Sequence, residues 1–451
     1  MKVLKVLPLL VATSLSAQGI EVTVYNNNQG FIKESREFNF SKGVSEFSFK
    51  DIASGILPTS VHLSGKSWDV NILEQNYRYD LVSIDKIFEK YLEEKVVIKL
   101  DKGEVFEGKL LAIPQQNKIV IGSKNGIQII NTDEVITFDF PELPEGLISK
   151  PELAWKLYSK KTGKQNIELS YLSSGLNWNA EYVALVNDKD TAMDLTSWVS
   201  VNNRSGKTFK NAQLKVIAGT LNQATNQFGN LRHLKSQSPA IMDGNELHFQ
   251  AQEESFFEYH LYTIPQKVTL KSNEEKQVTM FADSKVKTKK VYRFDKSYDT
   301  GKPENVDVVL TFENSKDDGL GLPLPQGRFR IYKKDSKGSN QLIGEDRIEH
   351  TPKDEEVKLK VGEAFDVVGE RRTKENRRIS NRVNEQTIEV SLRNHKEENI
   401  EVIVEARVWG DWEILKSNYQ YTKKSASKIE FKIPVKKDGE STLEYEIRFK
   451  H

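Results

Sequence analysis

LEYEIRF, residues 443–449, alternates apolar and polar side chains over its whole length. Successive side chains of an extended strand point to opposite faces, so its four apolar residues share one side. The same rhythm recurs at IEVSL (388–392) and IEFKI (429–433). Strands with one buried and one solvated face are typical of antiparallel sandwiches. We therefore expect a mainly β, multi-domain protein built from antiparallel, immunoglobulin-like β-sandwiches. Since the chain has no cysteine pair, true immunoglobulin ancestry is not implied.

One stretch has a helical pattern instead. SIDKIFEKYLEE (83–94) spaces its apolar residues three and four apart behind Ser83, a residue type that caps helices. Five short apolar runs follow, and a helix with five strands resembles the Sm-like, SH3-type small barrels. Three positions match the first half of the Sm pattern: Gly103, Gly108 and Asn117. The Arg-Gly of RNA-binding members has no counterpart in the second half. We expect a small Sm/SH3-like barrel carrying one helix at 79–141, and no nucleic-acid partner.

The amino-terminal stretch MKVLKVLPLLVATSLSAQG (1–19) has the build of a cleaved secretory signal: a basic start, an apolar core and small residues after it. The chain contains no cysteine, which excludes disulfides, thiol catalysis, thiolate metal sites and a lipid-modified cysteine. No later apolar run approaches the roughly 18 residues of a membrane helix. We expect a soluble, exported bacterial protein, periplasmic or extracellular, with no integral membrane segment after signal cleavage.

Changes of pattern along the chain divide it into segments. Residues 222–255 are polar and lack periodic apolar positions, which favours a mobile loop. The expected division is a signal peptide at 1–19, an N-terminal β domain at 20–78, the small barrel at 79–141, a β-sandwich at 142–285 that contains the loop 222–255, and a C-terminal β-sandwich region at 286–451.

Two short motifs look catalytic but are better explained as turns. NRSGKT (203–208) has the second half of a phosphate-binding loop, but Val201 replaces its first glycine and no helix follows. We interpret it as a hairpin turn. YDTGKP (298–303) contains an Asp-Thr-Gly triplet, yet the paired carboxylates of aspartic proteases need a second copy, which the sequence lacks. We interpret it as a polar turn.

Candidate acid–base groups are few. Glu258 and His260 would share one face of a strand, and Asp346 lies in the polar cluster GEDRIEH (344–350) together with His350. Such groups can serve acid–base catalysis, although most are surface or structural hydrogen-bond formers. The seven histidines show no pair at metal-ligand spacing. We expect no catalytic, cofactor-binding or metal-binding residues, and no cofactor.

Two surface features are candidates for ligand binding. The first is a basic segment, ERRTKENRRISNR (370–382), which suits an acidic polysaccharide, a lipid headgroup or an acidic protein face. The second is the WGDW turn (409–412), whose rings would suit sugar stacking. The alternative for the basic segment is a solvated connector between strands, and the alternative for the tryptophans is packing in the core. The expected ligand surface consists of Arg371, Arg372, Arg377, Arg378, Trp409 and Trp412.

Several longer segments together resemble a known family. They are VYNNNQGFIKESREFNF (24–40), LPTSVHLSG (57–65), SYLSSGLNWNAEYVALV (170–186), LTSWVSVNNRSGKTFKNAQLKVIAG (195–219), ESFFEYHLYTIPQKVTL (254–270) and IGEDRIEHTPKDEEVKLKVGEAFDVVGER (343–371). This set resembles the domain-of-unknown-function 4139 family of exported bacterial proteins, and the last two segments are the most specific. The N-terminal part is also similar to the opening domain of mucoidy-inhibitor-A-like proteins, which usually continue into a coiled coil that this chain replaces with the small barrel.

The resemblance implies an all-β envelope protein and brings no established activity. We expect a non-catalytic scaffold or binding module whose partner is an envelope protein or surface glycan. The alternative is a hydrolase that acts on envelope polymers, with acid–base groups near Glu258, His260 or Asp346. A third hypothesis is polyanion recognition through 371–382. The oligomeric state is left open.

Overall fold

The computed structural model describes residues 19–65, 70–79, 81–101, 103–124, 126–144, 147–148, 150–219, 251–296 and 298–450. These residues are mainly β, with one α-helix and two short 3₁₀ helices, η1 (Pro58–Ser60) and η2 (Thr132–Glu134). The mainly β, sandwich-rich fold predicted from the alternating stretches is confirmed. Three separate clusters of buried side chains form the cores. The signal sequence predicted at 1–19 lies outside the described residues except for Gly19.

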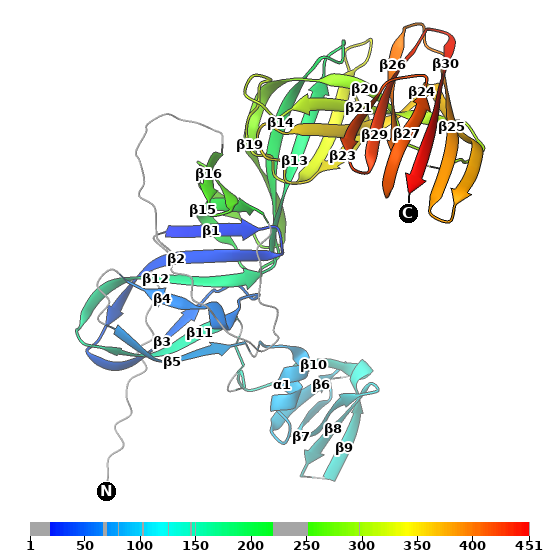
Figure 1. The fold of residues 1–451 in the computed structure, drawn as a ribbon. Helices are drawn as coiled ribbons and strands as arrows, with labels where there is room; N and C mark the ends of the chain where they lie inside the picture. Colours follow the sequence, from blue (N-terminus) through cyan, green and yellow to red (C-terminus); the bar gives the residue numbers. More distant parts are fainter. Residues whose placement is uncertain are drawn as a thin grey trace.

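The first sheet joins strands from the beginning of the chain with strands from its middle (Figure 1). Its order is β16-β17-β15-β1-β2-β12-β4, and β18 pairs with β15 off this path. The strands are β1 (Gly19–Tyr25), β2 (Gln29–Phe40), β4 (His62–Ser64), β12 (Gly163–Ser174), β15 (Phe209–Ala218), β16 (Gln252–Phe256), β17 (Tyr259–Thr263) and β18 (Val268–Leu270). Strand β1 runs parallel to β15 and antiparallel to β2. Pairing therefore links the segment 20–78 to residues beyond 142.

A three-stranded sheet lies beside this one. It has the order β3-β11-β5, formed by β3 (Gly43–Lys50), β5 (Val70–Arg78) and β11 (Glu152–Ser159). Phenylalanines 38, 40, 47 and 49 and Trp155 pack between the two sheets. Large aromatic rings bury much apolar surface, so this end of the first core is stabilised by packing without disulfides.

The small domain consists of α1 (Ile84–Lys90) and a five-stranded sheet, set apart from the other sheets in Figure 1. Ser83 caps the helix by accepting a hydrogen bond from the Lys86 amide. The strands are β6 (Lys95–Leu100), β7 (Val105–Gln115), β8 (Lys118–Ser123), β9 (Gly126–Asn131) and β10 (Val135–Asp139), in the order β10-β6-β7-β8-β9.

The predicted helix and five strands are therefore present and enclose a core of their own. After η2 the chain returns to pair β10 with β6, so β9 and β10 lie at opposite ends of the sheet. No pairing joins these two strands in the part of the chain that the structure describes, and the sheet is open.

A second five-stranded sheet completes the first core. Its order is β19-β14-β13-β22-β23, with β13 (Leu176–Val186), β14 (Ala192–Asn203), β19 (Glu274–Lys287), β22 (Gly327–Lys334) and β23 (Asn340–Ile348). Strands β12 and β13 follow each other through Gly175, β14 leads into β15 and β18 leads into β19, so the chain passes three times between this sheet and the first one.

The C-terminal sandwich is one nine-stranded sheet folded over its own core. Its order is β27-β30-β25-β24-β21-β20-β26-β29-β28. The strands are β20 (Lys289–Phe294), β21 (Glu304–Glu313), β24 (Glu356–Ser380), β25 (Val383–Asn394), β26 (Ile400–Arg407), β27 (Asp411–Ser417), β28 (Tyr421–Ser425), β29 (Lys428–Val435) and β30 (Gly439–Lys450). Phe431 and Tyr445 stack across the interior with ring centroids 5.0 Å apart.

Two long strands belong to both of the larger cores. Leu310 of β21 and Leu359 of β24 are buried in the first core, whereas Val306 and Val367 of the same strands are buried in the second. Strand β24 also passes close to β23: a Cβ atom on Gly344 would lie 2.2 Å from the Val361 carbonyl oxygen. Only glycine fits at position 344. Because β21 and β24 each contribute buried residues to both cores, this strand pair joins the two cores without an intervening linker.

Two further expectations meet the structure here. Most of the loop predicted at 222–255 lies outside the described residues, but Gln252–Ser255 belong to β16, so the end of that segment is a strand. Among the described residues no helix is long and apolar enough to cross a membrane.

Candidate functional site

Glu258 and His260 lie at one end of the first sheet, on the hairpin formed by β16 and β17. The turn consists of Phe257 and Glu258, and Phe257 has a positive φ of 58°. In the antiparallel register Ser255 faces His260, and Glu253 faces Tyr262. Because side chains alternate along a strand, Glu258, His260 and Tyr262 point to the same side of the sheet.

That side of the hairpin borders a pocket of about 130 Å³. His350, which follows β23, lies on its opposite wall together with Pro323, Leu324, Pro325 and Pro352. We call this cavity the His260–His350 pocket. The pocket is lined by the two sequence segments that carry the family resemblance most specifically, 254–270 and 343–371.

The two imidazoles are oriented by different partners. His260 Nδ1 lies 2.8 Å from Glu253 Oε1, so Nδ1 carries the hydrogen and Nε2 is left for other contacts. His350 Nδ1 instead accepts a hydrogen bond from the Gln326 amide at 3.1 Å, so in the neutral ring Nε2 carries the hydrogen. Burial lowers the pKa of His350, Glu349 opposes this, and His260 lowers it further. The His350 ring is therefore held toward its neutral form.

The hydroxyl groups of the pocket are already engaged. Tyr262 donates to the Pro323 carbonyl at 2.9 Å, and Thr351 donates to the Glu349 carbonyl at 2.9 Å. Burial, with a further contribution from Glu253, raises the pKa of Tyr262 above its ordinary value. Both hydroxyls therefore donate their hydrogens to backbone carbonyls.

Two exposed phenylalanines stand at the tip of this hairpin. Phe256 is 44% exposed and Phe257 is 80% exposed. The Phe257 ring lies 6.3 Å from that of Tyr259. An exposed aromatic pair beside a pocket is a feature of interaction sites, whereas single exposed apolar residues need no explanation.

Asp346 does not join Glu258 and His260. Its carboxylate accepts hydrogen bonds from the backbone amides of Arg347 (2.8 Å) and Lys360 (2.6 Å). The acid–base trio predicted from the sequence is therefore only partly brought together, and His350 takes the third place. Among the described residues no group of three His, Cys, Asp or Glu side chains could hold a metal ion.

A family model described as a domain of unknown function, DUF4139, matches residues 167–451. The chain belongs to this family. The comparison with curated proteins finds no match. The DUF4139 region begins within β12 and contains every residue that lines the His260–His350 pocket.

The basic segment of the DUF4139 region is paired with carboxylates on neighbouring strands. Arg372 lies 2.5 Å from Glu370. Arg377 lies 2.6 Å from Glu446 and 3.3 Å from Glu385. These contacts run across β24, β25 and β30, so the guanidinium charges are largely neutralised on the sheet itself.

The other two arginines of the proposed surface have local partners. Arg378 donates to the Asn381 side chain at 3.1 Å. Arg371 interacts with Tyr445, which burial gives a raised pKa of about 12. Each of the four arginines therefore already has a partner within the protein.

The two tryptophans of the WGDW turn differ in their surroundings. Trp409 is 52% exposed and stacks on Phe449 at a centroid distance of 4.7 Å. The Trp412 indole donates to the Ala426 carbonyl at 2.7 Å, and the ring packs against the second core with Lys423 4.9 Å above it. Trp409 thus remains available for stacking with a ligand, whereas Trp412 is engaged in core packing and a backbone hydrogen bond.

Lys207 of the SGKT sequence forms a buried ion pair. The turn leads from β14 in one sheet to β15 in another, so it is not the hairpin that we expected. Gly206 has a φ of 82°, and a Cβ atom there would lie 2.4 Å from Ser54 Oγ. Lys207 points inward and donates to Glu34 of β2, a residue outside the DUF4139 region, and to the Asp51 carbonyl. Lys207 has the sequence context of a phosphate-loop lysine, but its ionic partner is the internal Glu34 carboxylate.

Asp299 of the DTG triplet also has a structural role. Its carboxylate accepts hydrogen bonds from the amides of Thr373 at 3.1 Å and Gly301 at 3.0 Å. These backbone hydrogen bonds lower the pKa of Asp299. The interpretation of this motif as a turn agrees with that geometry.

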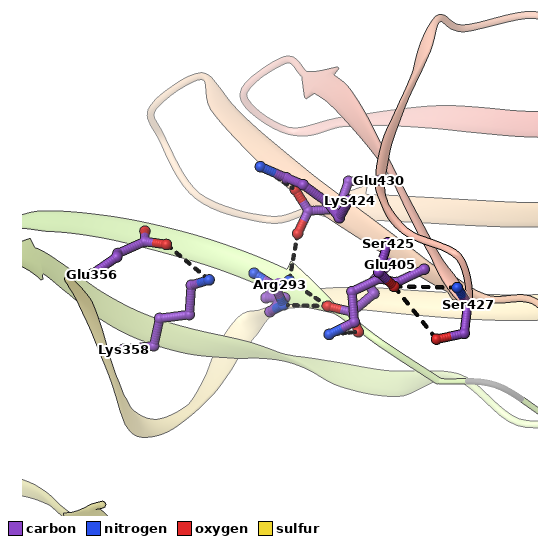
Figure 2. A network of polar contacts seen from close by, with 9 residues as sticks. Arg293, Glu356, Lys358, Glu405, Lys424, Ser425, Ser427 and Glu430 are labelled. Carbon is purple, nitrogen blue, oxygen red and sulfur yellow. Dashed lines mark hydrogen bonds and ion pairs between the residues drawn. The ribbon is translucent and has the colours of Figure 1, made fainter. Parts of the chain in front are cut away.

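Figure 2 shows another ionic cluster of the DUF4139 region, centred on Arg293 of β20. Its guanidinium contacts Glu405 of β26 and lies 2.6 Å from Glu430 of β29. Lys428 lies 2.6 Å from Glu405 as well. All these charges have opposite partners, so the cluster fixes three neighbouring strands and offers no site for a ligand.

Glu253, Tyr262 and the orientation of His350 were missed by the sequence reasoning. A signal was present for the first two: EESFFEYHLY (253–262) can form a hairpin with a two-residue turn at Phe257 and Glu258, in which Glu253 faces Tyr262. Nothing in the sequence indicated that residue 350 would return to this hairpin.

Proposed function

We propose that the chain is an exported, non-catalytic β-sandwich protein of the cell envelope that acts as a scaffold or binding module for a protein or surface glycan. The observation that carries the proposal is the pair Phe256 and Phe257, exposed at a hairpin tip beside the His260–His350 pocket. Exposed aromatic anchors next to a pocket are the usual centre of a binding surface. Export, an envelope location and solubility belong to the proposal and rest on the sequence of residues 1–19.

The pocket geometry supports binding more than polymer cleavage. A volume of about 130 Å³ holds roughly four water molecules. That is room for one side chain, whereas an enzyme that cleaves a polymer must enclose units on both sides of the reacting bond. The hydroxyls of Tyr262 and Thr351 are engaged with backbone carbonyls.

Site-specific photo-cross-linking in intact cells tests the proposal. A photoreactive phenylalanine analogue replaces Phe257 in one strain and Phe365, which is 89% exposed on β24, in a matched control strain. We expect discrete cross-linked adducts at position 257 and none at position 365. Equal adducts at both positions, or none at 257, would sink the proposal. Fractionation of the same cells should place the protein outside the cytoplasm.

The hydrolase is the second candidate, because Glu258 and His260 do meet in one pocket. Purified protein would be incubated with isolated envelope polymer, and soluble products would be measured for wild type and for Glu258→Gln. Under our proposal neither protein releases products above the buffer control. Release by wild type that Glu258→Gln abolishes would establish the hydrolase instead.

A further inference from the structure

Building on the proposed function, we infer that the His260–His350 pocket takes a lysine or arginine side chain from an extended polypeptide. The backbone of that polypeptide adds as a further strand to the outer edge of β16, which no described strand covers. The inference joins three observations: the charge around the pocket, the apolar lining of the pocket and the position of β16 in its sheet.

The charge around the pocket is negative. Alternation along the hairpin places Glu253 on the same side of the sheet as His260, and Glu258 lies at the pocket itself. Glu349 is adjacent to His350 in the sequence. None of the residues that line the pocket is lysine or arginine. A cationic group entering from solvent would therefore meet the Glu258 carboxylate, with Glu253 already paired to His260 and no lysine or arginine in the lining.

The walls suit the hydrocarbon part of such a side chain. Pro323, Leu324, Pro325 and Pro352 contribute apolar surface to the pocket that Glu258 also lines. Long basic side chains place their methylene groups on apolar surface and keep the charged end at a polar rim. The volume of about 130 Å³ is enough for one such side chain.

The edge of β16 supplies a place for the partner backbone. This strand is the last in the order of the eight-stranded sheet, and it pairs only with β17 among the described residues. Its outer edge carries backbone donors and acceptors that an extended peptide can use by strand addition. At the inner end of the hairpin, the Ala251 amide donates to the Met280 carbonyl at 2.8 Å, which holds the edge in position.

A lipid amine headgroup has the same cationic chemistry but no extended backbone. It would gain nothing from the edge of β16 or from the exposed Phe256 on that strand. The geometry therefore favours a polypeptide, and amine-bearing vesicles become an outcome of the test.

The experiment measures the fluorescence anisotropy of labelled nonapeptides of alternating threonine and valine. One peptide carries a central lysine, one carries norleucine with a similar stem and no charge, and one carries glutamate. We expect the lysine peptide to bind about tenfold more tightly than the norleucine peptide, because charge-assisted hydrogen bonds are worth more than neutral ones. Methylation of alternate peptide nitrogens should abolish binding, because strand addition needs the backbone donors.

Two variants localise the effect. Glu258→Gln should reduce the preference for lysine to less than about twofold, because it removes a carboxylate at the pocket. Glu254→Gln is the matched control, because Glu254 is exposed on β16 of the same hairpin and points to the face opposite Glu253 and Ser255. Both positions are exposed, so both variants should fold, which circular dichroism would verify.

Equal binding of the lysine and norleucine peptides would overturn the inference. So would an equal effect of the two variants, or binding of phosphatidylethanolamine vesicles without binding of any peptide. The proposed function fails separately: adducts at position 257 together with no lysine preference remove the inference only, whereas no adducts at 257 remove the binding proposal itself.

Discussion

The ammonium group of Lys207 lies 2.5 Å from the carboxylate of Glu34, where the two side chains are 2% and 0% exposed. Tyr171 donates to the same carboxylate at 3.2 Å, and Arg36 lies 2.8 Å from its second oxygen. Burial would raise the pKa of Glu34, but Lys207 and then Arg36 outweigh it and hold that pKa below its ordinary value. A strand near the start of the chain is thus joined by charge to a turn of the DUF4139 region.

Removing one partner of this pair should be costly. Lys207→Ala removes one of the two cations that compensate the buried Glu34 carboxylate, and we expect a loss of about 3–5 kcal/mol in the free energy of unfolding. Urea denaturation followed by circular dichroism measures it. The control is Lys164→Ala, which breaks an exposed pair with Glu37 and should cost less than about 1 kcal/mol. Similar losses in both variants would contradict the prediction.

Acid should weaken the contact between the two larger cores at Asp190. Burial alone would raise the pKa of this carboxyl, but hydrogen bonds from Lys290 (2.6 Å) and Lys333 (2.5 Å) outweigh it and hold the pKa below 3.8. A carboxyl with a lowered folded-state pKa adds stability above its unfolded value, and this is lost as pH falls through the folded-state value.

Asp190→Asn isolates that charge. Residue 190 has a φ of 57°, which asparagine tolerates, so the backbone need not change. We expect the variant to be less stable at pH 7 and to converge with wild type in thermal melts as pH is lowered below about 4. Parallel curves for the two proteins from pH 7 to pH 3 would show that Asp190 does not contribute.

The paired basic segment should bind polyanions weakly. Replacing Arg371, Arg372, Arg377 and Arg378 together with glutamine should leave retention on a dextran sulfate column nearly unchanged, because Glu370, Glu385 and Glu446 already occupy two of these guanidinium groups. The measurement is the salt concentration at elution. A large drop for the variant would restore polyanion recognition as a function.

The two tryptophans should differ in what they contribute to stability. Trp412→Ala removes a hydrogen bond and core packing, and we expect a loss of about 3 kcal/mol or more. Trp409→Ala removes a half-exposed ring and should cost about 1 kcal/mol. Thermal denaturation of both variants makes the comparison. A larger loss of stability in Trp409→Ala than in Trp412→Ala would contradict the prediction and show that stacking on Phe449 stabilises the fold more than core packing of Trp412.

Local structure could be predicted well from this chain. The alternating stretches at 388–392, 429–433 and 443–449 lie in β25, β29 and β30, with their apolar residues buried. The helix expected at 83–94 exists as α1 behind Ser83, although it ends at Lys90. In each case the pattern of a few neighbouring residues decides which side is buried.

Pairing could not be predicted, because a period of two shows which face of a strand is buried but not which strand lies beside it. The parallel contact of β1 with β15 joins residues almost 200 positions apart, as Glu21 faces Gln213. The same reason hid Lys207, since its carboxylate comes from β2, and His350, since its pocket is formed by a distant hairpin. The candidate site therefore emerged only in three dimensions.

The shared strands β21 and β24 have a mechanical consequence. They are continuous through both larger cores, so neither core can melt without stripping backbone partners from the other. We therefore expect no protease-sensitive site between the two cores at which cleavage releases an intact C-terminal fragment. Tension applied to the C-terminal sandwich would therefore pass along β21 and β24 into the first core.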